Sequence, residues 1–174
     1  RKFQPGFSDE PIPVFGPPDA AARMARAYDI PAEPGMSAQF DFREYHGAPI
    51  EIGPFTLTTT AVDHPVDAYA IRITNGTRTL VYSGDTGPCA SLEAIAAGAD
   101  LLLAEASFLE GEDNPEHLHM TGREAATIAT RAGVGRLVLT HIPPWYDAEA
   151  VLAEARPHFD GDVRLARPGL TITL

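Results

Sequence analysis

Apolar runs of strand length alternate with helical patterns in the second half of the chain. The runs at residues 79–83, 101–104 and 137–140 are short and continuous, as in strands covered on both faces. Between them, residues 91–97 and 121–132 carry apolar side chains at helical spacing. Thr121 and Glu124 have the spacing of a capping box at the start of the second helix. This half therefore predicts a strand–helix–strand–helix–strand arrangement.

The first half of the chain is rich in strand patterns. The predicted strands are residues 12–15, 38–45, 50–52, 55–62 and 68–74, and Asn75-Gly76 predicts a hairpin turn after the last of them. A helix is expected from Asp19, as its N-cap, to Tyr28. Towards the C-terminus we expect a helix over residues 147–156 and strands at 163–165 and 170–174. The order predicts one α/β layered domain over residues 1–174 with a mixed sheet.

Bulk properties narrow the class of protein. The chain has 174 residues, no apolar run long enough to span a bilayer and no signal-peptide pattern. The single cysteine, Cys89, excludes an internal disulfide framework and fits a reducing compartment, so we expect a cytoplasmic protein without a membrane segment. The net charge is −11, and Lys2 is the only lysine. This balance favours a small substrate over a long nucleic acid, which normally requires a basic surface.

Polar residues with metal-binding or proton-transfer chemistry follow several of the predicted strands. Asp85, Glu105 and His141 each stand at the carboxyl end of a strand, where sites form in open α/β sheets, and His64 follows the strand at 55–62. Two imidazoles and a carboxylate, from His64, His141 and Asp85, are a common ligand set for first-row metals. Each also has an ordinary explanation, because strand-end histidines are often structural and Asp85 suits a turn.

Glu105 and His119 suggest a second kind of chemistry. A carboxylate at the end of an apolar strand must be paired or face solvent, and a Glu–His pair orients an imidazole for proton transfer. His117 and His119 lie two residues apart in a polar loop, where they are either a metal pair or solvated side chains. Trp145 and Tyr146 follow two prolines and either line a pocket or simply pack.

The same residues belong to sequence motifs that resemble those of a known protein family. The motifs are His64 with Tyr69-Ala70-Ile71-Arg72-Ile73, Ser83-Gly84-Asp85-Thr86, Glu105-Ala106-Ser107-Phe108, His119-Met120-Thr121 and Leu139-Thr140-His141. In this order the chain resembles metallo-β-lactamase-fold hydrolases of the ribonuclease Z-like branch. The run Thr140-His141-Ile142-Pro143-Pro144-Trp145 is similar to actinobacterial members proposed to act on cyclic nucleotides.

The resemblance implies a fold, a cofactor and site roles. The fold is an αββα sandwich with two divalent metal ions, zinc or manganese, at one edge. Asp85 would bridge the ions, with His64 completing the ligands of one and His141 those of the other. A hydroxide bound by both ions would attack phosphorus. His119, oriented by Glu105, would protonate the leaving oxygen or hold the phosphate. The family also suggests a homodimer.

The chain departs from the family at one motif. The His-x-His-x-Asp-His sequence that supplies the other ligands is absent from these 174 residues. Asp85, His64 and His141 offer at most two ligands to each ion, too few for a tight site. We therefore expect the C-terminal portion of such a hydrolase, lacking its N-terminal strands, with an N-terminal segment of the same protein completing the site.

The function expected from the sequence is hydrolysis of a small phosphodiester such as a cyclic nucleotide. The alternatives are 3′ processing of tRNA, and hydrolysis of another ester, a lactone or a β-lactam. A further alternative from a different class is a degenerate, metal-free module that only binds a partner.

Overall fold

The computed structural model describes residues 10–174, and the chain forms two compact units that divide between His46 and Gly47. The first unit contains two parallel strands, β1 (Ile12–Gly16) and β2 (Phe40–Glu44), and the helix α1 (Ala20–Ala27) between them. The expectation that the Asp19 side chain caps α1 is wrong. Asp19 has a left-handed backbone with φ 65°, and its side chain makes no capping hydrogen bond, because a capping side chain requires an extended N-cap residue.

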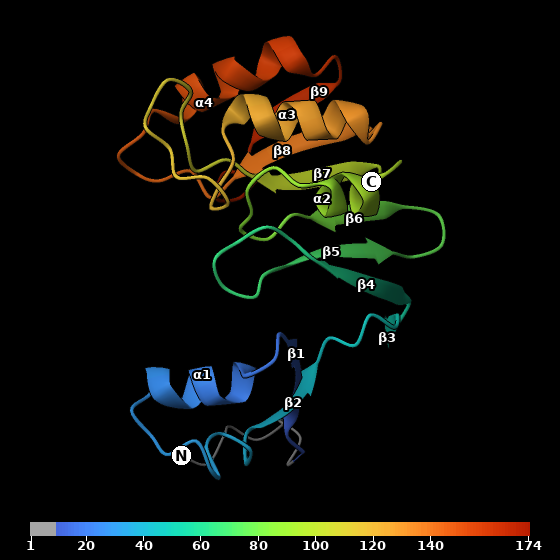
Figure 1. Ribbon diagram of the computed structural model, residues 1–174. Coiled ribbons are helices and arrows are strands. Elements are labelled where there is room, and N and C mark those ends of the chain that lie inside the picture. The colour runs from blue at the N-terminus through green and yellow to red at the C-terminus, as the bar shows by residue number, and fades with distance from the viewer. Residues whose placement is uncertain (1–9) are drawn as a thin grey trace. The chain divides into compact units, whose positions relative to one another are not determined.

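The second unit is built on a seven-stranded mixed sheet, coloured from teal through green to orange-red in Figure 1. Its strands pair in chain order, with β3 to β6 antiparallel and β6 to β9 parallel. The strands are β3 (Ile50–Ile52), β4 (Phe55–Ala61), β5 (Tyr69–Thr74), β6 (Thr79–Tyr82), β7 (Leu101–Glu105), β8 (Arg136–Thr140) and β9 (Asp162–Leu165). The predicted hairpin joins β5 to β6, and Asn75 Oδ1 accepts the backbone N–H of Arg78 at 2.8 Å.

Three helices pack against one face of this sheet and form the core with it. They are α2 (Ala90–Ala96), α3 (Gly122–Arg131) and α4 (Ala148–Ala155), the last followed by a 3₁₀ turn (Arg156–His158). Alternate residues of the central strands enter this core, among them Leu102, Ala104, Leu137 and Leu139, all fully buried. The capping box of α3 is confirmed, since Thr121 Oγ1 accepts the N–H of Glu124 and Glu124 Oε2 accepts that of Thr121.

The C-terminal segment differs from the prediction. Residues 170–174 form no strand, because a turn at Gly169 with φ 81° redirects the chain after β9. Their alternating apolar side chains lie instead against the sheet face opposite the helices. Together they line a cavity of about 250 Å³ with Leu80, Leu101, Leu103 and Val138. The period of two therefore reflects one-sided contact with the sheet and not strand pairing. Within residues 10–174, no helix has the length and apolarity needed to cross a membrane.

Candidate metal and hydrolytic site

The parallel strands β6, β7 and β8 bring three of the predicted site residues to one edge of the sheet. Asp85 follows β6, Glu105 is the last residue of β7, and His141 comes directly after β8. Carboxyl ends of adjacent parallel strands meet at the same edge, as expected from the sequence. His64 follows β4, and His119 stands in the loop before α3.

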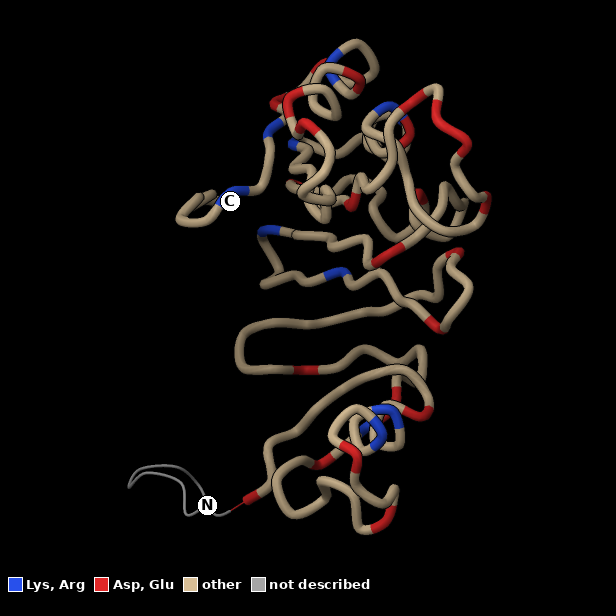
Figure 2. The backbone as a smooth tube through the Cα atoms, turned by 90° about the vertical axis from the view of Figure 1, so that its left-hand side faces the viewer, with Lys and Arg blue, Asp and Glu red and all other residues tan. Residues whose placement is uncertain are grey.

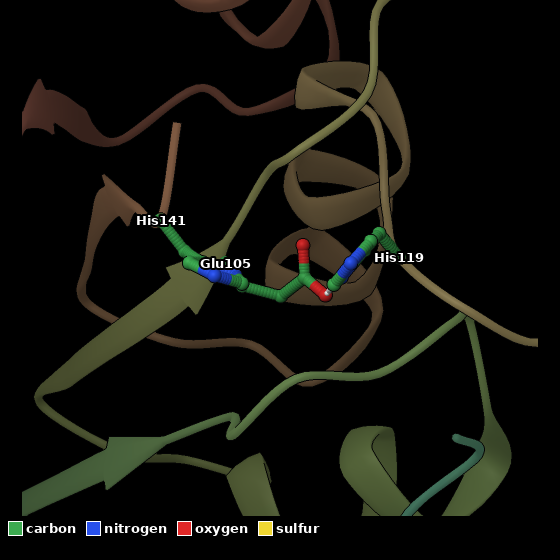
Figure 3. Close-up of side chains that lie close together, drawn as sticks. All are labelled: Glu105, His119 and His141. Atoms are coloured by element: carbon green, nitrogen blue, oxygen red, sulfur yellow. Dashed lines mark hydrogen bonds and ion pairs between the residues drawn. The ribbon is translucent and has the colours of Figure 1, made fainter. Parts of the chain in front are cut away.

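Glu105 is fully buried, and its carboxylate is surrounded by hydrogen-bond donors. Oε1 accepts the N–H of Thr86 at 2.9 Å, and Oε2 accepts those of Ser107 at 3.1 Å and Met120 at 3.4 Å. Oε1 also lies 2.6 Å from Nδ1 of His119, and Figure 3 shows the carboxylate turned toward that ring. The predicted Glu105–His119 pair is therefore present in the structure. Because Nδ1 of His119 faces a carboxylate, it carries the proton, and Nε2 is the nitrogen left for chemistry.

Three imidazole rings form a row beside this carboxylate. The ring centroid of His119 lies 5.5 Å from that of His64 and 5.3 Å from that of His141. Nδ1 of His64 lies 2.9 Å from the carbonyl oxygen of Leu118, so this nitrogen donates and Nε2 is again free. Phe108 packs edge-on against His119 with a centroid distance of 5.2 Å, giving the row one apolar wall.

His141 is held in an unusual backbone conformation next to Asp85. Its φ is 57°, in the left-handed region, and Ser107 Oγ donates to its carbonyl oxygen at 2.6 Å. The same hydroxyl lies 3.0 Å from His141 Nδ1, and Asp85 Oδ1 lies 3.3 Å from that nitrogen. The side chains of His141 and Asp85 remain 46% and 40% exposed, so both are accessible to a ligand.

Charge near this edge also affects Tyr82, the last residue of β6. Burial raises the pKa of Tyr82 above its ordinary value, and the nearby carboxylates of Asp85 and Glu105 raise it further. The phenol therefore remains protonated around neutral pH and is not a candidate base.

The structure also reveals contacts that the sequence did not indicate. His117, which has no assigned part in the resemblance, places Nδ1 2.7 Å from Asp63 Oδ2. Ser107 supports His141, a role that its place in the motif Glu105-Ala106-Ser107-Phe108 did not by itself indicate. Trp145 is 76% exposed and contacts Tyr146 at a ring distance of 6.3 Å, so it does not pack into the core.

Two cavities flank the row of imidazoles. One, of about 420 Å³, is lined by Phe108, His119 and the acidic loop that precedes His119. The other, of about 490 Å³, is lined by His141, Ile142, Tyr146 and Arg167. Both have the size of small-molecule sites.

The residues at this edge suit a divalent metal ion. Ligand atoms of Glu105, His119 and His141 all lie within 4.8 Å of one another (Figure 3). Imidazole nitrogens and carboxylate oxygens are the donors that zinc and neighbouring first-row metals take. Both oxygens of Glu105 already accept N–H groups, whereas Asp85 and His141 are accessible and adjacent. The donor set therefore fits a metal, with Glu105 better suited to orienting His119 than to ligation.

Comparison with known proteins agrees with this chemistry. The model of the beta-lactamase superfamily domain matches residues 1–142. The crystal structure of the metallo-beta-lactamase fold protein YhfI from Bacillus subtilis superposes with a TM-score of 0.78 and 33% identity, covering 91% of this chain and 63% of that one. By sequence, YhfI is named a probable metallo-hydrolase and is 40% identical over 121 residues, which are 70% of this chain and 50% of YhfI.

Two further relatives show how the similarity is distributed. The protein ML1173 of Mycobacterium leprae is 38% identical over 179 residues, covering all of this chain and 63% of its own length. A ribonuclease Z of Myxococcus xanthus is 44% identical over 101 residues, covering 56% of this chain and 33% of that enzyme. The chain thus spans somewhat less than two thirds of the length of ML1173 and YhfI, although these matches cover most of the chain itself. With the family model matching most of its residues, the chain belongs to the beta-lactamase superfamily and has the metallo-β-lactamase fold expected from its motifs.

Proposed function

We propose that this chain is part of a metal-dependent phosphodiesterase that hydrolyses a small phosphodiester such as a cyclic nucleotide. The observation that supports the proposal most directly is the buried Glu105–His119 pair, 2.6 Å apart, in a row of imidazoles next to Asp85. A carboxylate-held imidazole is suited to transferring a proton to an oxygen leaving group.

In this proposal, His64, Asp85 and His141 hold two divalent ions, zinc or manganese. When bound there, divalent ions supply Lewis-acid polarisation of a phosphoryl oxygen and lower the pKa of water. These three residues provide too few ligands for two tight sites. We infer that further ligands come from a segment of the same protein outside these 174 residues, since the chain spans only 63% of its relatives YhfI and ML1173.

Residues of this chain would donate the proton to the leaving group. Glu105 fixes Nδ1 of His119 as the protonated nitrogen, so Nε2 is the atom that meets the substrate. A proton on Nε2 is donated to the departing oxygen or hydrogen-bonds the phosphate. The Glu105 carboxylate also fixes the orientation of the ring.

Charge and cavity size favour a small substrate. The net charge is −11, and along the described backbone the basic residues are scattered without forming a continuous strip (Figure 2). Phosphate-rich polymers normally bind to such strips. Both flanking cavities hold less than 500 Å³, which suits a nucleotide-sized molecule.

Processing of tRNA 3′ ends is the second candidate. It is supported by the similarity to the ribonuclease Z of Myxococcus xanthus, which is confined to a third of that enzyme. The charge distribution supports it less well than it supports a small substrate.

The test compares substrates on the full-length protein loaded with zinc or manganese. We expect hydrolysis of 3′,5′-cyclic AMP, loss of that activity in EDTA, and its return on adding metal. Cleavage of a tRNA precursor without cyclic-nucleotide hydrolysis would support the endonuclease alternative. Absence of bound metal after incubation with excess zinc, together with no hydrolysis of either substrate, would contradict both and leave a binding module.

A further inference from the structure

Hydrogen bonds connect Glu105 with three separate segments of the chain, at residues 63, 86 and 117–119. Glu105 Oε1 accepts the N–H of Thr86, whose Oγ1 accepts the N–H of Asp63 at 3.1 Å. Asp63 Oδ2 lies 2.7 Å from Nδ1 of His117, and two residues later His119 returns to Glu105 Oε1. The Asp63–His117 pair is thus one of the contacts that join the histidine loop to the segment containing His64.

The peptide between the two loop histidines also reaches His64. The carbonyl of Leu118 accepts a hydrogen bond from His64 Nδ1 at 2.9 Å. A partner on the far nitrogen fixes which tautomer a metal-binding histidine adopts and how its ring is oriented. The position of the 117–119 backbone therefore determines which nitrogen His64 offers and where His119 stands.

The loop backbone adopts a conformation that requires support. His117 has φ 61°, which is uncommon for a residue other than glycine and is maintained by surrounding contacts. Gly87 packs so closely beneath it that a Cβ there would lie 3.2 Å from Cα of His117 and 3.4 Å from the nitrogen of Leu118. Gly87 N also donates to the carbonyl of Asp63 at 2.8 Å, so the same glycine touches both ends of the pair.

From this geometry we propose that Asp63 and His117 are positioning residues, which hold the Leu118 carbonyl so that His64 presents Nε2 to a metal and His119 faces the substrate. The assignment of His64 and His119 rests on the proposed function. The His117 side chain is 70% exposed and that of Asp63 is 35% exposed, so the pair lies at the surface. Because exposed ion pairs add little to folding stability, the main effect of the pair is on geometry.

The first measurement is the tautomer of His64 in metal-free protein, read from long-range ¹H–¹⁵N correlation spectra of the full-length chain. In the wild type we expect the proton on Nδ1. In Asp63→Asn and His117→Ala we expect a mixture of tautomers, while the thermal midpoint stays near the wild-type value. His117→Asn is the conservative rescue, because asparagine tolerates a left-handed backbone and retains an N–H donor.

The second measurement is zinc affinity, determined by competition with a fluorescent chelator. Loss of a residue that orients a ligand typically weakens metal binding by about 10- to 100-fold. We expect a weakening of about 10-fold in Asp63→Asn and His117→Ala. Gly87→Ala displaces the same peptide without altering a polar group and should act in the same direction. Glu116→Gln is the matched control, since Glu116 neighbours His117 but is 93% exposed and lies 3.9 Å from its Nε2.

The outcomes separate this inference from the proposed function. An unchanged His64 tautomer together with wild-type zinc affinity in Asp63→Asn and His117→Ala would overturn it. Neither readout requires turnover, so absence of phosphodiester hydrolysis would reject the proposed function without deciding the inference. If the wild type bound no zinc, the tautomer measurement alone would decide, and an altered ratio in the variants with recovery in His117→Asn would support the inference.

Discussion

Glu105 Oε1 and His119 Nδ1 lie 2.6 Å apart, although the carboxylate belongs to a buried strand end and the imidazole to a loop fourteen residues later. The strand end is fully buried, and three backbone N–H groups hold the carboxylate in place. The loop supplies an imidazole whose ring is 18% exposed. The pair thus joins the buried Glu105 carboxylate to the His119 side chain, which is still partly exposed to solvent.

Replacing His119 with alanine should remove proton transfer and leave metal binding intact. General acid catalysis contributes roughly 10²- to 10⁴-fold, so kcat for cyclic-nucleotide hydrolysis is expected to fall within that range. Steady-state kinetics and elemental analysis of the same preparation test both halves of the prediction. A variant that also lost its metal would mean that His119 is itself a ligand.

Glu105→Gln should destabilise the fold, since the amide NH₂ must face a backbone donor where a carboxylate oxygen stood. A buried donor left without an acceptor costs about 1–3 kcal/mol of unfolding free energy. Urea denaturation measures the loss. Glu93→Gln, on the exposed side of α2, should change the midpoint little. Equal midpoints for Glu105→Gln and the wild type would show that the donors find other partners.

Asp85→Ala and His141→Ala should each weaken zinc binding by at least 10-fold, because each removes an accessible donor of an adjacent pair. Isothermal titration calorimetry on the full-length protein gives the affinity. Asp162→Asn removes a carboxylate from β9, where it pairs with Arg164, and serves as the control. Zinc binding that survives both site substitutions would move the metal to other residues.

Asp100 should make stability depend on pH at the opposite end of β6. The backbone N–H of Thr79 and the guanidinium of Arg78 hold the pKa of Asp100 below its ordinary value. A depressed pKa in the folded state stabilises the protein above the unfolded pKa, and that stabilisation is lost as pH falls through the folded value. The difference in urea midpoint between the wild type and Asp100→Asn should therefore be present at pH 6 and vanish toward pH 2. A constant difference over this range would contradict the prediction.

Features encoded by neighbouring residues could be predicted from the sequence. The hairpin at Asn75, the capping box of Thr121 and Glu124, and the strand-end positions of Asp85, Glu105 and His141 depend on local spacing, and all are present. The strand–helix–strand–helix–strand arrangement predicted for the second half of the chain is present as well.

Several features that depend on distant contacts were not predicted. The Asp63–His117 pair joins residues 54 positions apart, and Ser107 reaches His141 across 34. No local pattern records such pairings. For the same reason the prediction of a strand at residues 170–174 is wrong, because alternation identifies a one-sided extended segment but not what it contacts. Asp19 failed as a cap because residue type alone does not fix its backbone.

The left-handed backbone of His141 implies a trade-off between durability and chemistry. This conformation costs about 1–2 kcal/mol of folding free energy for a residue with a side chain, whereas glycine adopts it with almost no cost. A library of this protein selected only for heat resistance should therefore enrich glycine or asparagine at position 141. The same library selected for turnover should return histidine every time.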